Sequence, residues 1–262
     1  MAVYVRFEDC GVVKFGEVKG ETVEILSGCI YENTLNPTGE TIALSAIKKY
    51  LTPVEIPNVL AIGANYIDHC KECDAEAPKN PLVFIKTTNA LAAHGDEIVL
   101  PRLTPDAVDY EAELAVIIGK AAKNVEPEQA LDYVFGYTCA NDVSARDCQY
   151  ENGQWARGKS FDNFCPLGPW IETELDPLDL EITGKRNGKV VQNSRTSLMI
   201  FPIPFLISYL SRTMTLLPGT VLLTGTPAGV VLGVKNDPQW LKPGETFEVE
   251  IEGLGSLKSV FK

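Results

Sequence analysis

The segment from Val108 to Gly119 reads V-D-Y-E-A-E-L-A-V-I-I-G, and it constrains the fold more than any other part of this 262-residue chain. Acidic residues occupy alternate positions in its first half, and apolar residues fill the positions between and beyond them. An alternation with a period of two predicts a half-buried β-strand, in which same-face neighbours lie roughly 6.5 Å apart. One face of the strand therefore carries the carboxylates of Asp109, Glu111 and Glu113.

Carboxylates in such a row repel one another unless a cation or water separates them. A set of ligands made only of oxygen atoms suits a hard divalent ion such as Mg²⁺, Mn²⁺ or Ca²⁺. The alternative is an acidic edge strand whose charged face is solvated. This strand alone does not separate the two interpretations.

Composition narrows the class of protein. The chain is 45% hydrophobic and 22% charged, values typical of a soluble globular protein, and its length allows one large domain or two smaller ones. A net charge of −12 argues against a nucleic-acid or anionic-membrane partner. The chain shows neither a membrane-spanning apolar run nor a signal peptide, so we expect it in the cytoplasm.

The sequence offers few residues for cysteine or histidine chemistry. The seven cysteines are scattered and odd in number, which favours reduced thiols that serve mainly as packing residues. Cys70 and Cys73 form a C-x-x-C pair, but no second pair stands at the spacing of a zinc site, so packing is favoured over a redox or zinc role. The histidines are His69 and His94.

Residues 1–57 are expected to form a small β-rich N-terminal domain and a linker. Short strands are predicted at Val3–Glu8, Val12–Val18 and Thr22–Leu26, because turn residues separate these apolar-rich runs. A short helix is predicted around Leu44–Tyr50. A proline-bounded linker, T-P-V-E-I-P-N, follows it.

Residues 58–262 are expected to form a second, strand-dominated domain, which makes the chain an α+β protein. Helices are predicted at Pro127–Tyr133 and Pro204–Thr213. A hairpin is predicted around Arg186-Asn187-Gly188, since Asn-Gly suits a type I′ turn. Further strands are predicted at Leu82–Lys86, Glu97–Leu100, Tyr110–Ile118, Phe135–Ala140, Thr220–Thr224, Thr246–Glu252 and Leu257–Phe261.

Asp142 is a further candidate ligand. It lies in G-Y-T-C-A-N-D-V-S-A-R-D, where a predicted strand passes into a polar loop that can position a functional group. The alternative is a local turn stabilised by an ion pair between Arg146 and Asp147.

His69 and Glu72 are candidates for acid–base chemistry. If His69 begins a helical turn, Glu72 lies three residues on, on the same face and in contact. A carboxylate beside an imidazole fixes its tautomer and makes it a stronger base. The alternative is an ordinary surface pair.

Lys159 lies in W-A-R-G-K-S-F-D-N-F-C-P-L-G-P, a loop bounded by aromatic residues and proline. A lysine in such a loop can bind an anionic substrate or stabilise a developing oxyanion. The alternative is a solvated lysine of no chemical role.

Six motifs follow one another along the chain: N-Y-x-D-H-x-x-E, P-L-V-F-x-K, D-Y-E-A-E-L-A-V-I-I-G-K, N-D-V-S-A-R-D-x-Q, G-K-S-F-D-x-F-C-P-L-G-P and L-T-G-T-P-A-G-V. Together and in this order, they resemble the fumarylacetoacetate hydrolase family. The resemblance extends from about Val59 to the C-terminus and implies a mixed β-roll catalytic domain and a homodimer. The N-terminal unit also resembles the short leading domain of many bacterial members.

The resemblance implies roles for individual residues. Glu111, Glu113 and Asp142 would bind one Mg²⁺, with Mn²⁺ or Ca²⁺ as possible substitutes, and Asp109 would be a neighbour. His69 would be the general base, oriented by Glu72, and Lys159 would stabilise the oxyanion. The substrate-binding positions would be Lys86, Arg146, Gln149 and Thr226.

The implied function is a Mg²⁺-dependent enzyme acting on small 2-oxo or 2,4-dioxo carboxylates through a chelated enolate. Hydrolytic C–C cleavage and enol–keto isomerisation share that enolate, and so do the narrower alternatives of an oxaloacetate tautomerase or decarboxylase. An alternative of another class is a catalytically silent protein that binds a divalent metal or a 2-oxo acid. One position departs from the family: many members read G-R-N-Y, whereas Ala64 here replaces an arginine that often helps hold a substrate carboxylate.

Overall fold

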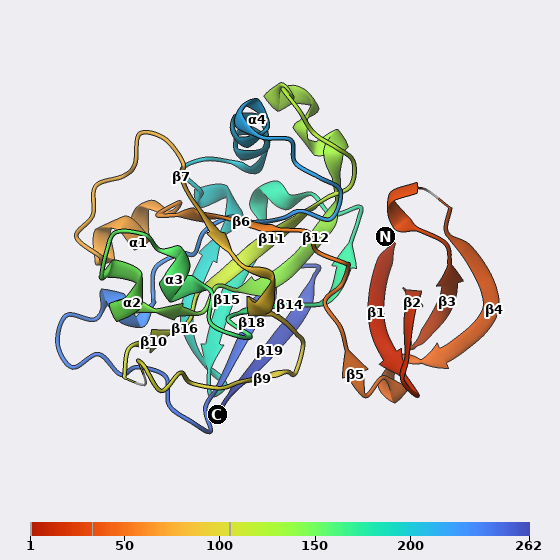
Figure 1. Ribbon diagram of the computed structural model, residues 1–262, viewed down its shortest axis with the longest axis horizontal. Helices are drawn as coiled ribbons and strands as arrows, with labels where there is room; N and C mark the ends of the chain where they lie inside the picture. The colour runs from red at the N-terminus through yellow and green to blue at the C-terminus, as the bar shows by residue number, and fades with distance from the viewer. Residues whose placement is uncertain (1, 33, 105) are drawn as a thin grey trace.

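The computed structural model describes residues 2–32, 34–104 and 106–262, which fold into a large lobe and a small N-terminal lobe (Figure 1). The larger sheet comprises β1 (Val3–Asp9), β2 (Val12–Lys19), β3 (Thr22–Ser27), β4 (Asn36–Ala43), β5 (Lys49–Tyr50), β6 (Val59–Gly63), β7 (Leu82–Lys86), β8 (Leu91–Ala93), β11 (Ala112–Ile118), β12 (Val134–Asn141), β14 (Cys165–Glu172) and β17 (Val221–Leu223). Its order is β4-β3-β2-β1-β14-β12-β11-β17-β6-β7, with β5 paired to β1 and β8 paired to β14.

The second sheet packs against the first and has the order β16-β15-β18-β19-β9. Its strands are β9 (Glu97–Ile98), β15 (Glu181–Arg186), β16 (Lys189–Arg195), β18 (Thr246–Ile251) and β19 (Gly255–Phe261). A short separate pair joins β10 (Val108–Asp109) to β13 (Ser144–Ala145). The mixed sheets confirm the predicted strand-dominated α+β fold of the β-roll type.

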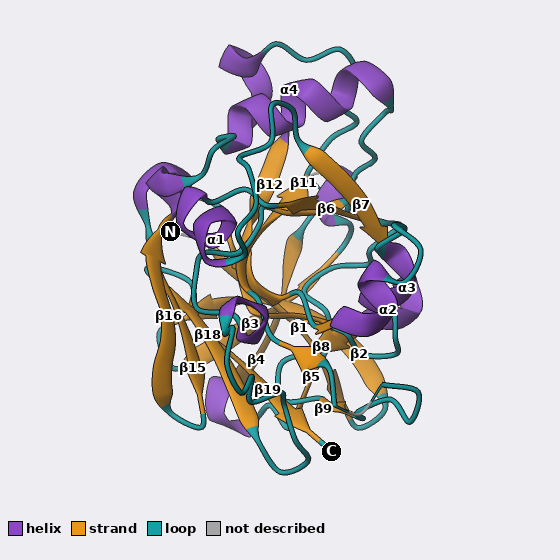
Figure 2. Cartoon of the chain, turned by 90° about the vertical axis from the view of Figure 1, so that its left-hand side faces the viewer, coloured by secondary structure: helices purple, strands orange, loops and turns teal. Residues whose placement is uncertain are grey.

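The helices are short and lie around the sheets (Figure 2). The α-helices are α1 (Ile67–Glu72), α2 (Arg146–Tyr150), α3 (Ala156–Lys159) and α4 (Ile203–Thr213). The 3₁₀ turns are Ile30–Glu32, Leu44–Ala46, Thr88–Ala90, Pro127–Tyr133, Pro177–Asp179, Thr196–Leu198 and Val231–Gly233. Within the described residues, none of these helices has the length and apolar character that crossing a membrane requires.

The N-terminal lobe has its own small core, but backbone pairing between strands connects it to the large lobe. Its three leading strands are those predicted, and their buried side chains include Val5, Phe7 and Val23. Strand β1 pairs antiparallel with β14, and Tyr4 lies opposite Ile171. The larger sheet therefore continues from one lobe into the other.

The helix predicted around Leu44–Tyr50 is wrong. Only Leu44–Ala46 turns, as a 3₁₀ helix, and the chain then extends into β5, where Tyr50 pairs with Phe7. Pairing with β1 thus overrides the local helical pattern. Strand β4 was not predicted; it is an edge strand, a position that tolerates Pro37.

The predicted hairpin and the predicted helices are found, with one change of type. Strand β15 ends at Arg186 and β16 begins at Lys189. Between them, Asn187 and Gly188 both have positive φ, as a type I′ turn requires. The C-terminal helix begins at Ile203, whereas Pro127–Tyr133 forms a 3₁₀ helix rather than an α-helix.

The prediction that the strand after Val108 is half-buried is wrong. Every residue of β11 is buried, because β12 and β17 flank it in the larger sheet while β15 and β18 of the second sheet pack against it. The acidic residues and the apolar residues of this strand therefore lie on opposite faces, and both faces are buried. An acidic edge strand with a solvated face is excluded.

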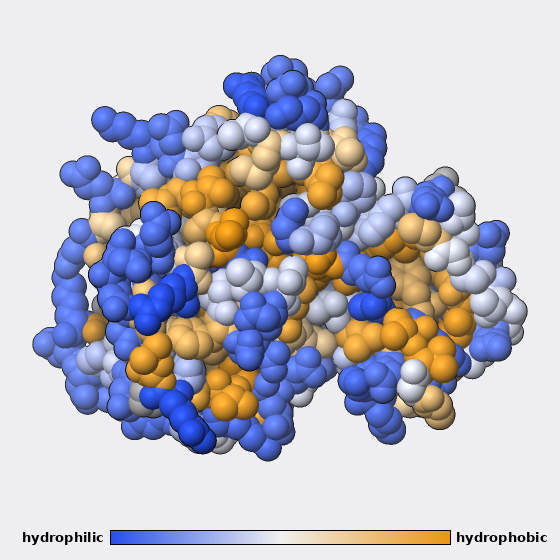
Figure 3. All heavy atoms as spheres, viewed as in Figure 1, coloured by the Kyte–Doolittle hydropathy of each residue, from blue (hydrophilic) through white to orange (hydrophobic). Residues whose placement is uncertain are grey.

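Hydrophobic residues also reach the surface, over the region where Figure 1 places β6 and β7 (Figure 3). Strand β7 lies at the end of the larger sheet and exposes Val83 and Ile85. An edge strand with exposed apolar side chains is a surface that a second polypeptide can cover.

We predict that Leu114→Ala lowers the free energy of unfolding by about 2–5 kcal/mol, because it opens a cavity in the central strand where Leu114 is 0% exposed. Leu103→Ala makes the same chemical change at a side chain that is 64% exposed and should alter stability by less than about 0.5 kcal/mol. Urea denaturation measures both values. Equal losses would contradict the packing described for β11.

Candidate active site

Glu111, Glu113 and Asp142 come together although they belong to different segments. Strands β11 and β12 are antiparallel neighbours with Ala112 opposite Asn141, so the chain places Asp142 beside Glu111. The amide N–H of Asp142 donates to the carbonyl oxygen of Glu111 at 3.0 Å. One carboxylate oxygen from each of the three side chains lies within 4.8 Å of the others, and all three side chains are buried. We call these three residues the carboxylate cluster.

Two lysines donate directly to the carboxylate cluster. Lys159 Nζ lies 2.7 Å from Glu111 Oε2 and 2.7 Å from Asp142 Oδ2. Lys86 Nζ lies 2.5 Å from Asp142 Oδ1 and also donates to the carbonyl oxygen of Val143 at 3.1 Å. Both lysines are almost completely buried. They are therefore counter-ions of the cluster, and the alternative of a solvated lysine at position 159 is excluded.

Arg146 links the carboxylate cluster to Asp109. Its guanidinium forms ion pairs of 2.7 Å with both Glu111 and Asp109. The Asp109 carboxylate also accepts the backbone N–H groups of Val231 and Leu232 at 2.9 and 3.0 Å. Asp109 is thus fully engaged outside the cluster, and the predicted alternative of an ion pair between Arg146 and Asp147 is wrong.

The charges around the cluster do not balance. Among the described residues, the carboxylates of Asp109, Glu111, Glu113 and Asp142 face the cations of Lys86, Arg146 and Lys159, which leaves one negative charge in excess. The pKa of Glu113 is raised well above its usual range, chiefly by burial and further by repulsion from Asp142 and Glu111. Burial also acts to raise the pKa of Glu111, but Lys159 and Arg146 outweigh it and lower this pKa to about 2.

This donor set fits a hard divalent cation. It offers only carboxylate oxygens, it is buried, and it carries an excess negative charge, so the raised pKa of Glu113 favours a proton there. Such a cation would replace that proton.

His69 and Glu72 form a pair on α1, as their spacing predicts. His69 Nδ1 lies 2.8 Å from Glu72 Oε1, and the other oxygen of Glu72 accepts the backbone N–H of Gly229 at 2.8 Å. Gly229 has a φ of +110°, which side chains disfavour, and a Cβ at this position would lie 2.0 Å from the carbonyl oxygen of Val191. Only glycine therefore fits at this position. The side chains of His69 and Glu72 are 12% and 19% exposed, which is not the exposure of an ordinary surface pair.

The pair changes the acidity of the imidazole. Burial acts to lower the pKa of His69, but hydrogen bonding to Cys73 and Glu72, together with the charge of Glu111, outweighs it and raises this pKa to about 10. In the absence of a bound cation, His69 therefore carries a proton at neutral pH.

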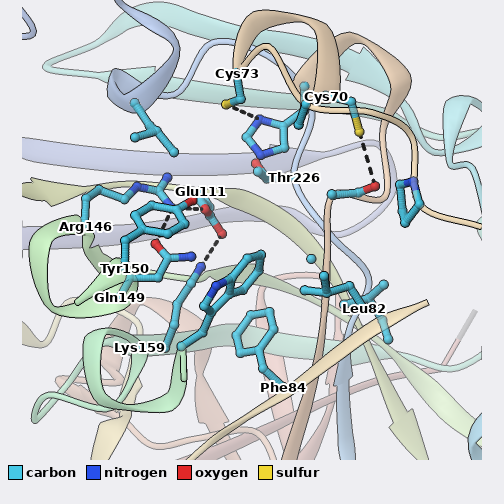
Figure 4. A pocket seen from close by; sticks show the side chains of 18 of the residues that line it. Cys70, Cys73, Leu82, Phe84, Glu111, Arg146, Gln149, Tyr150, Lys159 and Thr226 are labelled. Carbon is cyan, nitrogen blue, oxygen red and sulfur yellow. Dashed lines mark hydrogen bonds and ion pairs between the residues drawn. The ribbon is translucent and has the colours of Figure 1, made fainter. Parts of the chain in front are cut away.

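A cavity of about 450 Å³ brings the histidine and the carboxylates together (Figure 4). The side chains of Leu82, Phe84 and Trp155 form an apolar wall. The predicted site residues that line the cavity are His69, Glu111, Glu113, Arg146, Gln149, Lys159 and Thr226.

Three predicted site residues do not line the cavity. Glu72 instead contacts His69, and Asp142 contacts Lys159. Lys86, predicted to bind substrate, instead has its ammonium group on Asp142. Thr226 does line the cavity, but its hydroxyl donates to the carbonyl oxygen of Ala112 at 3.0 Å.

The sequence did not reveal the apolar wall or the backbone donors. Phe84 and Trp155 come from distant segments, and their rings meet at a centroid distance of 5.4 Å. Gly225 and Gly229 donate backbone N–H groups to Glu113 and Glu72. Their glycine-rich segment, L-T-G-T-P-A-G-V, was the available signal.

The mixed sheets place a His–Glu pair and buried carboxylates beside one cavity, an arrangement typical of an enzyme's active site. The chain belongs to the fumarylacetoacetate hydrolase family: the family model described as fumarylacetoacetate (FAA) hydrolase C-terminal matches residues 58–262. A second model, described as Rv2993c-like, N-terminal, matches residues 4–53. The resemblance inferred from the motifs is confirmed.

Relatives with names and structures support this membership. The chain is 41% identical over 254 residues to protein Rv2993c of Mycobacterium tuberculosis, covering 94% of this chain and 92% of that protein. It is 45% identical over 213 residues to the mitochondrial oxaloacetate tautomerase Fahd2a of Rattus norvegicus, covering 79% and 67%. The structure of 2-hydroxyhepta-2,4-diene-1,7-dioate isomerase from Mycobacterium marinum matches with a TM-score of 0.88 at 37% identity, covering 100% and 98%.

We predict that Mg²⁺ binding to the wild-type protein strengthens as pH rises, because the proton that the raised pKa of Glu113 retains must leave when the cation binds. In Glu113→Gln that proton is absent, so binding should be weaker and should release fewer protons. Calorimetry in two buffers of different ionisation enthalpy counts the released protons. Equal proton release by the two proteins would contradict the assignment.

Proposed function

We propose that this protein is a divalent-metal-dependent enzyme that interconverts the keto and enol forms of small 2-oxo carboxylates. One observation carries the proposal: His69, held by Glu72, lines the same cavity as Glu111 and Glu113. A group able to transfer a proton would therefore share with the proposed cation site a space large enough for a small acid. The names of the tautomerase and isomerase relatives support an enzyme over a silent binding protein.

Glu111, Glu113 and Asp142 would hold the ion, for which we propose Mg²⁺, with Mn²⁺ or Ca²⁺ as substitutes. When bound, such an ion acts as a Lewis acid toward the keto and carboxylate oxygens of a 2-oxo acid. Lys86 donates to Asp142 and does not line the cavity, so we assign it a positioning role.

His69 would move the proton between carbon and oxygen. Because the ionised carboxylate of Glu72 can only accept, Nδ1 carries the proton of their hydrogen bond, and Nε2 is left to exchange a proton with the substrate. The pKa of about 10 in the cation-free protein keeps Nε2 protonated. Since Glu111 contributes to that raised pKa, neutralising its charge would lower the pKa of His69, which favours the form in which Nε2 can act as a base.

Lys159 and Arg146 bring positive charge to the cavity wall. Lys159 Nζ is fixed by Glu111 and Asp142, which suits it to stabilise the oxygen that becomes negatively charged as the proton leaves carbon. Arg146 also donates to the side-chain oxygen of Gln149 at 3.0 Å. We propose that Gln149 and Thr226 orient the substrate, since both line the cavity.

The apolar wall favours a second candidate function, hydrolytic C–C cleavage of a 2,4-dioxo acid. Leu82, Phe84 and Trp155 provide a surface for an uncharged acyl group, and Ala64, which also lines the cavity, brings no charge for a second carboxylate. In that reaction His69 would take a proton from water as its oxygen bonds to the distal carbonyl carbon. The C–C bond then breaks, and the proton passes to the departing carbon.

The homodimer, the cytoplasmic location and the lack of a nucleic-acid or membrane partner also remain proposals. The edge strand β7 supports the dimer, because Val83 and Ile85 would be covered by a second copy. The net charge of −12 supports the expectation about nucleic acids and anionic membranes.

Proton NMR of EDTA-treated protein, with and without Mg²⁺, tests the proposal with oxaloacetate and acetylpyruvate in separate tubes. We predict faster enol–keto exchange in oxaloacetate, dependent on Mg²⁺ and without cleavage. His69→Asn should slow it by about 10²–10⁴-fold because the proton-transfer group is lost. His94→Asn is the matched control, since His94 does not line the cavity, and it should retain the rate.

Enol–keto exchange that is equally fast without Mg²⁺, or full activity of His69→Asn, would overturn the proposal. Mg²⁺-dependent formation of pyruvate and acetate from acetylpyruvate would favour the second candidate. Faster release of pyruvate from oxaloacetate would identify a decarboxylase.

A further inference from the structure

One turn at the end of α1 gathers three different donor atoms. His69, Glu72 and Cys73 stand at positions i, i+3 and i+4 and therefore share one face. Their ligand atoms all lie within 4.8 Å of one another, and His69 Nδ1 is 2.8 Å from Glu72 Oε1 and 4.0 Å from Cys73 Sγ. All three residues are partly exposed, and His69 and Cys73 line the cavity.

We propose that His69 Nδ1, the Glu72 carboxylate and Cys73 Sγ form a second metal site, which takes a thiophilic ion such as Zn²⁺. Nitrogen, oxygen and sulfur donors suit tetrahedral Zn²⁺, whereas the all-oxygen carboxylate cluster suits a hard ion. Tetrahedral Zn²⁺ bonds of about 2.0 Å to nitrogen and about 2.3 Å to sulfur place these two atoms about 3.5 Å apart. Cys73 therefore needs to approach only slightly, and a fourth ligand could reach the ion from the cavity that His69 and Cys73 line.

The neighbouring groups distinguish Cys73 from Cys70. The Cys73 sulfur points toward the imidazole ring, whereas the Cys70 sulfur is directed to a backbone carbonyl, that of Ala64 at 3.5 Å (Figure 4). Cys70 is also only 2% exposed. The second oxygen of Glu72 is already fixed by the N–H of Gly229, so this ligand is held in place before an ion arrives.

Zn²⁺ at this site would stop His69 from acting as a base. As the metal–sulfur and metal–nitrogen bonds form, the Cys73 thiol proton leaves to solvent, and the proton displaced from Nδ1 is taken up at Nε2 through solvent. The neutral ring then carries its one proton on Nε2, where no lone pair is left to accept another. Inhibition rests on the proposed function, whereas the site itself does not.

Co²⁺ added to the full chain, with excess Mg²⁺ present and a phosphine reductant to keep the thiols reduced, tests the site by absorption spectroscopy. We expect the sulfur-to-cobalt charge-transfer band and the intense visible bands of tetrahedral Co²⁺, both abolished by one equivalent of Zn²⁺. Cys73→Ser and Cys73→Ala should both lack the sulfur band. Cys70→Ser, the matched control, should retain it.

A wild-type spectrum without a sulfur band, or a band that survives in both Cys73 variants, would overturn the site. Zn²⁺ should inhibit the Mg²⁺-loaded wild type, and the Cys73 variants, each compared with its own rate, should need more than about 10-fold higher Zn²⁺. A sulfur band without inhibition would support the site and contradict the proposed role of His69 instead.

Discussion

The burial of three carboxylates beside one another is the constraint on which the rest of the site depends. Like charges taken out of water cost several kcal/mol each unless cations and hydrogen bonds compensate them. Lys86, Lys159 and Arg146 are all buried and all directed at Glu111, Asp142 or their neighbour Asp109. The compensation is incomplete, and the raised pKa of Glu113 is the result. This imbalance in the core supports the proposal that the site holds a further cation.

This constraint explains why the site lies where it does in the architecture. The antiparallel pairing of β11 and β12 places Asp142 beside Glu111, and the second sheet excludes water from the other face of β11. The loop after β17 contributes backbone N–H groups rather than charge: Gly225 donates to Glu113, and Gly229 donates to Glu72. The same loop therefore positions both Glu113 of the carboxylate cluster and Glu72, the partner of His69.

Local features could be predicted from the sequence, whereas features that depend on distant segments could not. The His69–Glu72 contact follows from a spacing of three in one turn, and the hairpin turn follows from Asn-Gly. That Asp142 joins Glu111 was implied by family resemblance alone, because spacing does not reveal strand register. The prediction of a half-buried strand was wrong because no local sequence signal indicates that the second sheet packs against β11. The contact of Lys86 with Asp142 was likewise not predicted, since the two residues are 56 positions apart and the resemblance alone gave Lys86 a role at the substrate.

Diffraction from crystals soaked in Mn²⁺ would test the central claim most directly, because the anomalous signal of this ion locates it without reference to activity. The account predicts one strong peak within bonding distance of Glu111, Glu113 and Asp142, with Asp109 still bound to Arg146. A cluster that stays free of the ion in the presence of excess Mn²⁺, or a peak coordinated by Asp109 in place of Glu113, would contradict it.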